Sequence, residues 1–137
     1  MTTYESDIKT ISANNEMVFA KLTDLTNLEQ FKDKIPADAN ISDIECDTES
    51  VHLNVSPIGK IGLRIVEKEE FKTIKFAADQ SPIEFNIWIQ LVPSTDSETK
   101  LKATLKAELP AMIKMMMGNK MQDIVNQVAT ALTKLDY

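Results

Sequence analysis

The sequence predicts an α+β fold in which a curved antiparallel sheet of about seven strands packs against one long C-terminal helix. Two observations support this prediction. Between residues 41 and 109, apolar and polar residues alternate with a period of two, the pattern of strands that are buried on one face. Residues 110–137 instead repeat their apolar residues with the helical period, without a turn-forming break.

The N-terminal part predicts one strand followed by two short helices. Residues 3–11 alternate as a strand, and the polar stretch 12–15 offers side chains that can cap the following helix. A second short helix is expected over residues 27–34, ending before Pro36 because the residue before a proline avoids helical geometry. The apolar residues expected to cover one end of the sheet are Phe19, Leu22, Leu28 and Phe31.

Six further strands are expected at about residues 41–47, 50–56, 60–69, 71–78, 82–93 and 98–109. Their short connections favour antiparallel neighbours. In the last two strands the alternation is clearest, and the set predicted to face the core is Ile83, Phe85, Ile87, Ile89, Leu91, Leu101, Ala103, Leu105, Ala107 and Leu109. The sheet therefore has one dry face and one wet face.

The C-terminal segment predicts one amphipathic helix that begins near Pro110, which fits a first turn because its missing N–H costs nothing there. About 25 residues rise nearly 40 Å, close to the length of the longest strands, so the helix can cover the dry face. Its apolar stripe contains Ile113, Met117, Met121, Ile124, Val125, Val128, Ala131, Leu132 and Leu135.

Length and charge restrict the class of protein. With 137 residues, a single domain over residues 1–137 is expected. A net charge of −6 argues against nucleic acid as a partner, and no apolar run is long enough for a membrane span. Without a signal peptide, and with Cys46 as the only cysteine, a cytoplasmic location is expected.

No catalytic residue, metal site or cofactor is predicted. The only histidine, His52, alternates out of phase with its apolar neighbours and should face solvent. The inward positions of the last two strands contain no ionisable group, which argues against acid–base catalysis. Glu67 and Lys75 are in phase with positions that point inward or that lie near strand ends, and both interpretations stay open.

Two features suggest contacts with other molecules. Trp88 alternates with polar residues, so it is expected to be exposed, half-covered by a neighbour or in contact with a partner protein. Five of the seven methionines lie between residues 112 and 121. Of these, Met112, Met115 and Met116 fall off the apolar stripe. Because thioether chains adapt to varied shapes, this turn is interpreted either as a gate packed under a loop or the short helices, or as irregular core.

The order strand, two short helices, six strands and one long helix resembles the helix-grip fold of the START and Bet v 1-like (SRPBCC) superfamily. The opening resembles its small bacterial polyketide-cyclase-like members. The stretches that carry the resemblance are Ile11-Ser12-Ala13, Met17-Val18-Phe19-Ala20-Lys21-Leu22, Thr23-Asp24-Leu25-Thr26-Asn27-Leu28, Phe31, and the apolar final helix behind the Leu-Lys-Ala-Thr-Leu strand. The resemblance implies a sheet that grips the helix, with a cavity that in many relatives takes a lipid, sterol, polyketide or other apolar molecule.

The expected function is non-enzymatic binding of a small hydrophobic ligand, of a lipid, sterol, polyketide or quinone-like kind. The residues expected to line the cavity are Ile87, Ile89, Leu105, Ala107, Met117, Met121, Ile124 and Val128. Two alternatives stay open. One is an enzyme of the cyclase, dehydratase or hydrolase kind in the same pocket. The other is a protein-interaction module with a filled cavity, which contacts its partner through Trp88 or the methionine-rich turn.

Overall fold

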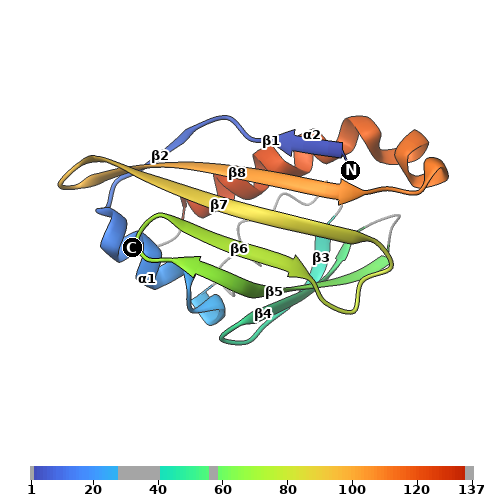
Figure 1. Ribbon diagram of the computed structural model, residues 1–137, viewed down its shortest axis with the longest axis horizontal. Helices are drawn as coiled ribbons and strands as arrows, with labels where there is room; N and C mark the ends of the chain where they lie inside the picture. Colours follow the sequence, from blue (N-terminus) through green and yellow to red (C-terminus); the bar gives the residue numbers. More distant parts are fainter. Residues whose placement is uncertain (1, 28–40, 56–58, 135–137) are drawn as a thin grey trace.

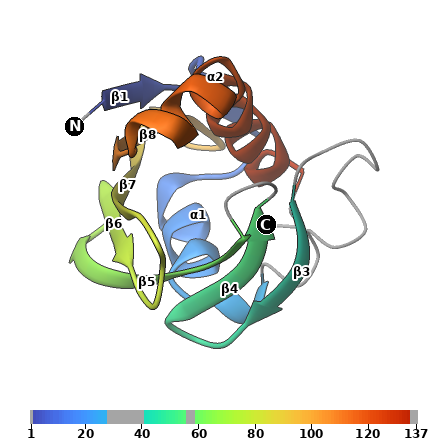
Figure 2. The same ribbon diagram turned by 90° about the vertical axis from the view of Figure 1, so that its right-hand side faces the viewer.

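The computed structural model describes residues 2–27, 41–55 and 59–134, apart from the side chains of residues 41 and 117–119. It confirms the α+β class, with one antiparallel sheet that curves around the C-terminal helix (Figures 1 and 2). The elements are β1 (Thr2–Glu5), β2 (Lys9–Ile11), α1 (Asn15–Leu22), β3 (Ile41–Cys46), β4 (Ser50–Val55), β5 (Gly59–Glu69), β6 (Thr73–Ala78), β7 (Glu84–Thr95), β8 (Glu98–Glu108) and α2 (Ala111–Leu132).

The strand order is β1-β8-β7-β6-β5-β4-β3, and β2 also pairs with β8. One strand was expected over residues 3–11, and the structure divides it into β1 and β2. Glu5 pairs with Thr104, and Lys9 pairs with Leu101. The N-terminal segment therefore advances four residues where β8 advances three, so it contains one extra residue. The extra residue is accommodated at Ser6, whose hydroxyl accepts a hydrogen bond from the Ala103 N–H at 2.9 Å.

Two other strand boundaries differ from expectation. Residues 71 and 72 belong to a turn rather than to β6, because Phe71 has a positive φ of 62° and its ring packs edge-on against Phe19 at 5.7 Å. The second difference is that β7 is longer than expected at its C-terminal end and continues through Pro93 to Thr95. The last β7 residue paired with β6 is Gln90, so beyond it this side of β7 is an edge, where a proline is tolerated.

Helix α1 closes one end of the sheet. Asn14 caps it by accepting a hydrogen bond from the Met17 N–H at 2.8 Å, and Val18 and Leu22, one turn apart, are buried. Leu25, in the helical turn of residues 25–27, is also fully buried. The second predicted short helix, residues 27–34, falls almost entirely outside the described residues.

The turn between β3 and β4, near the end of the sheet that α1 closes, is stabilised by hydrogen bonds to Asp47. Hydrogen bonds from the Ser50 hydroxyl and from the backbone N–H groups of Glu49 and Ser50 lower the pKa of the Asp47 carboxyl below its usual 3.8. In the same turn, the Thr48 carbonyl accepts a hydrogen bond from the Leu25 N–H at 3.0 Å. The turn thus connects the β3–β4 hairpin to the segment after α1.

Helix α2 packs mainly against β8 and β1. Its Gln122 donates a hydrogen bond to the Glu5 carbonyl at 2.6 Å, and its Asn126 accepts one from the Asp7 N–H at 2.9 Å. One flank of α2 therefore faces the β1–β2 edge. The opposite flank, which carries Ile124 and Val128, faces away from that edge.

Gly62 marks a close approach of three chain segments at the other end of the sheet. It pairs with His52 on β4, and its carbonyl accepts a hydrogen bond from the Asp79 N–H at 2.8 Å. A β-carbon at this position would collide with the Asp79 carbonyl oxygen and lie 2.7 Å from the His52 Cδ2 atom. Only glycine fits here without movement of the backbone.

Gly62→Ala should therefore lower the free energy of unfolding by about 1–3 kcal/mol, because the added methyl group forces the backbone apart. Urea denaturation at neutral pH measures this. Lys60→Ala, on the same face of β5 and exposed, is the matched control and should change the value by no more than about 0.5 kcal/mol. Equal denaturation midpoints for Gly62→Ala and Lys60→Ala would contradict the close approach.

The lowered pKa of Asp47 predicts a pH-dependent contribution to stability. A carboxyl with a lower pKa in the folded than in the unfolded state stabilises the fold above the unfolded pKa, and this stabilisation is lost as the pH falls through the folded pKa. Asp47→Asn should thus lower the melting temperature at pH 7, and the difference from wild type should shrink below pH 3.8. Ser50→Ala removes the largest cause of the shift and should weaken this pH dependence. A constant difference at all pH values would show that the charge of Asp47 contributes nothing.

Candidate functional site

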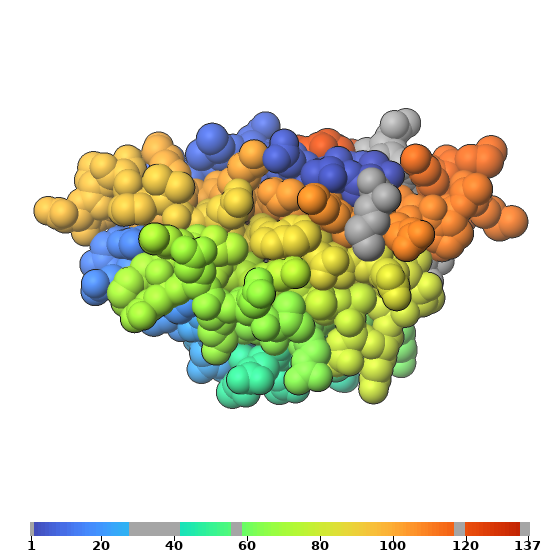
Figure 3. Space-filling view, in the orientation of Figure 1, coloured from blue at the N-terminus to red at the C-terminus, as the bar shows by residue number. Residues whose placement is uncertain are grey.

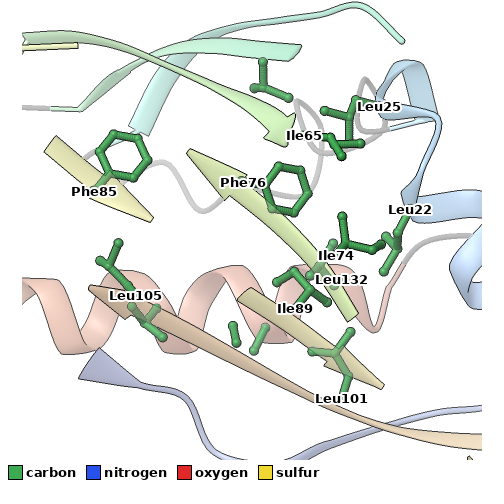
Figure 4. Packing of buried hydrophobic residues seen from close by; sticks show 14 of the residues in the cluster. Leu22, Leu25, Ile65, Ile74, Phe76, Phe85, Ile89, Leu101, Leu105 and Leu132 are labelled. Carbon is green, nitrogen blue, oxygen red and sulfur yellow. The ribbon is translucent and has the colours of Figure 1, made fainter. Parts of the chain in front are cut away.

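The interior between the sheet and α2 is tightly packed at the end that α1 closes. Figure 4 shows Leu22 of α1 beside Ile74 of β6, Ile89 of β7 and Leu132 of α2. All four side chains are buried. Among the described residues, the inward side chains of β6 and β7 at this end, Ile74, Ile89 and Leu91, are all buried.

The inner face of β4, β5 and β7 away from α1 is less completely covered. Val51, Val55 and Phe85 on this face are buried, but other apolar side chains keep part of their surface accessible while packing against the core. Two residues on the α2 flank that faces away from β1 do the same. We call this set the inner apolar surface, and it consists of Leu53, Ile61, Leu63, Ile87, Ile124 and Val128. Among the described elements, α2 makes its main strand contacts with β8 and β1.

The residues predicted to line a cavity fall into two groups. Ile87, Ile124 and Val128 belong to the inner apolar surface. The residues Ile89, Leu105, Ala107 and Met121 are buried in the packed core. The remaining residue, Met117, lies in α2, and its side chain is outside the described residues.

Three members of the inner apolar surface, Leu53, Ile61 and Leu63, were not predicted as ligand-lining residues. Leu53 pairs with Ile61, and Leu63 with Val51, so the inward phase of these strands was available from their alternation. The alternation does not show where α2 lies over the sheet. That position decides which of the inward residues stay accessible.

Polar side chains buried among the described residues have structural partners. The Thr99 hydroxyl donates to the Ala13 carbonyl at 2.8 Å and so joins β8 to the start of α1. The Ser6 hydroxyl donates to the Asp7 carbonyl at 2.9 Å. Within residues 2–27, 41–55 and 59–134, no Asp, Glu, Lys, Arg or His is buried, and Tyr4 is the one buried side chain with a proton-donating aromatic hydroxyl. The same part of the chain shows no His, Cys, Asp and Glu cluster suited to a metal ion.

The ionisable residues considered from the sequence lie on the outer face. His52 is 43% exposed, and its Nε2 atom is 3.8 Å from the Asp79 carboxylate. Glu67 pairs with Lys75, and the register of β5 shifts between Ile65 and Glu67. This irregularity moves Glu67 out of the inward phase that it would otherwise share with Ile65, so an inward position for Glu67 or Lys75 is wrong.

Trp88 is half-buried on the outer face, between two lysines. The Nζ atoms of Lys75 and Lys106 lie 5.4 Å and 5.5 Å from its ring centroid, close enough for cation–π attraction. Of the three arrangements expected for Trp88, the structure shows the one in which neighbours half-cover it.

The methionine-rich turn is exposed. Met112, Met115 and Met116 are 74%, 87% and 53% exposed, whereas Met121 in the same helix is 5% exposed. The expectation that these three side chains pack under a loop or the short helices, or fill irregular core, is therefore wrong. The first turns of α2, which carry these residues, extend past the end of β8 (Figure 1).

No helix in the described part of the chain is both long and apolar enough to cross a membrane. No protein-family model and no curated protein sequence matches the chain.

Solved structures do match the fold. A START superfamily protein from Mycobacterium smegmatis superposes with a TM-score of 0.64 at 16% identity, over 96% of this chain and 94% of that one. The protein XoxI from Bacillus cereus gives 0.70 at 13% identity, over 98% and 94%. Norcoclaurine synthase from Thalictrum flavum, in complex with dopamine and hydroxybenzaldehyde, gives 0.69 at 10% identity, over 97% and 86%. With the curved antiparallel sheet and the C-terminal helix, these similarities show that the chain has the START/Bet v 1-like helix-grip fold.

Proposed function

We propose that the protein binds a small apolar molecule against the inner apolar surface, between the sheet and α2, without transforming it. The observation that carries this proposal is the unequal burial of the interior. At the end near α1, Leu22, Ile74, Ile89 and Leu132 are buried. The side chains that stay partly accessible are Leu53, Ile61, Leu63, Ile87, Ile124 and Val128. Concave apolar surfaces with few polar groups are typical of small-molecule sites.

Ligand chemistry follows from what these side chains offer. All six are aliphatic, so they supply dispersion and hydrophobic contact, worth about 25 cal/mol for each Å² of apolar area removed from water. They donate no directed hydrogen bonds. A hydrocarbon-rich ligand such as a lipid, sterol, polyketide or quinone-like molecule fits these contacts better than a charged metabolite.

Binding is favoured over polyketide-cyclase-like catalysis because the described interior offers no acid–base pair. Norcoclaurine synthase shows that a protein of this fold can be an enzyme that takes aromatic molecules. Among the described residues, Tyr4 is the one buried phenol, and the buried hydroxyls of Ser6 and Thr99 are already engaged with the backbone. We place the protein in the cytoplasm as part of this proposal, in keeping with its single cysteine.

Native mass spectrometry of the purified protein, followed by organic extraction, is the direct test. We expect an apolar species bound at a defined stoichiometry. A bare protein mass, together with no thermal shift in the presence of fatty acids, sterols or quinones, would contradict the proposal. That result would favour a filled interior and a protein partner instead.

A substitution within the inner apolar surface should weaken binding of a fluorescent fatty acid. In Ile124→Trp the larger side chain occupies space that the ligand needs, and we expect the dissociation constant to rise by at least about tenfold. Gln127→Trp introduces the same side chain at an exposed position one turn away on α2 and should leave the dissociation constant unchanged. Fluorescence titration measures both variants, and circular dichroism confirms that each is folded. Equal affinities for the two variants would place the ligand elsewhere.

A further inference from the structure

The methionine-rich turn at the start of α2 holds three thioether side chains that face water. Met112, Met115 and Met116 are 74%, 87% and 53% exposed. They lie on the first turns of the helix, which extend past the end of β8. In Figure 3 this part of α2 forms the orange projection at the right of the molecule.

These methionines are on the side of α2 that is opposite to its buried side. At about 100° per residue, the three side chains fall within about 100° of one another, and Met121 lies about 180° from Met112. Met121 is only 5% exposed, and it shares the buried side with Val125. A single helix therefore carries methionines in two environments, one open to water and one enclosed by the core.

A hydroperoxide oxidises a methionine thioether by transferring one oxygen atom to it. A lone pair of the sulfur attacks the outer peroxide oxygen, so that an S–O bond forms while the O–O bond breaks. The sulfur loses two electrons, and the transferred oxygen gives its proton to the departing oxygen, which leaves as water or an alcohol. Because the sulfur must meet the oxidant, an exposed thioether reacts and a buried one is protected.

We propose that the methionine-rich turn is a reversible oxidation site, at which hydroperoxides convert Met112, Met115 and Met116 to sulfoxides while Met121 and the fold are preserved. A sulfoxide is polar, so three of them remove the apolar character of this exposed segment. Methionine sulfoxide reductases reverse the change, because two thiols become a disulfide while the oxygen leaves as water. The polarity of the helix start thus depends on the oxidants around the protein.

The rest of α2 is held by contacts that this oxidation does not alter. Gln122 donates a hydrogen bond to the Glu5 carbonyl, and Asn126 accepts one from the Asp7 N–H. Met121 is buried between these anchors and the sheet side of the helix. Because the oxygen atoms are added where the side chains already meet water, no sulfoxide has to enter the packed interior. We therefore expect the oxidised protein to keep its fold.

Peptide mapping after mild treatment with hydrogen peroxide tests the selectivity. Trypsin cleaves after the lysines of this segment, so residues 107–114, 115–120 and 121–134 form separate peptides. The first and the last of these peptides contain one methionine each, Met112 and Met121. Fragmentation of the middle peptide in the mass spectrometer resolves its methionines. The rate of oxidation is thus measured for each side chain.

We expect Met112 to be oxidised at least about tenfold faster than Met121 in the folded protein, because the Met121 sulfur is enclosed. Met115 and Met116 should react at rates near that of Met112. In a concentration of urea that unfolds the chain, all four should react at similar rates, because their exposure no longer differs. Oxidation of Met121 at the rate of Met112 in the folded protein would overturn the proposal.

Hydrophobic-interaction chromatography measures the change in surface polarity. Peroxide should shorten the retention time of the wild-type protein. In the triple variant Met112→Leu, Met115→Leu and Met116→Leu, the turn keeps its apolar surface and its helix propensity but has no sulfur to oxidise, so the shift should be much smaller. Met17→Leu is the matched control, because Met17 is 48% exposed on α1. This variant should shift nearly as far as wild type, and equal shifts for wild type and the triple variant would overturn the assignment to this turn.

Two further measurements test the preserved fold and the reversibility. The oxidised protein should melt cooperatively, near the temperature of the untreated protein, when followed by circular dichroism. Loss of that transition would overturn the preservation of the fold. Reductases specific for each of the two sulfoxide epimers, supplied with a dithiol, should restore the original retention time. A shift that persists after this treatment would overturn the reversibility.

Discussion

The pairing of β7 with β8 is the contact on which the rest of the structure depends. These two strands pair from Glu84 opposite Glu108 to Thr95 opposite Glu98. The other edge of β8 holds β1 and β2, and its inward side chains support α2. Through Thr99, β8 also holds the start of α1. Strand β8 thus positions the N-terminal segment and both helices. The remaining strands follow on the other side of β7, in the order β6, β5, β4 and β3. Helix α2 lies over the β8 side, and on the far strands β4 and β5 the inward side chains of Leu53, Ile61 and Leu63 stay partly accessible.

The alternation of β7 and β8 and the periodicity of α2 were sufficient to predict the fold, because each pattern records burial on one face along its own segment. Features that depend on contacts between distant segments were not predictable in this way. The break between β1 and β2 is fixed by Ser6 on the backbone of β8, and the position of Phe71 depends on its packing against Phe19. The candidate site was predicted only in part for the same reason. Helix and strand lengths agreed, but their offset, which exposes Met112 and Met115 and leaves Leu53 accessible, is a property of the packed molecule.

The ligand that we propose for this interior would be recognised by its size and shape, because the side chains that line it are aliphatic. Without buried charges among the described residues, the interior has few means of rejecting one hydrocarbon-rich molecule in favour of another of similar volume.

The two lysines that cover Trp88 have a practical consequence. Trp88 is the only tryptophan in the chain, and it lies on the outer face of the sheet, across β7 from the interior. Intrinsic fluorescence of the protein therefore originates from a site that no ligand in the interior touches. A titration with a saturated ligand that does not absorb in the range of tryptophan emission would therefore leave that emission unchanged. The same emission would respond sharply to denaturant, because separation of β6, β7 and β8 removes both ammonium groups from the indole at once.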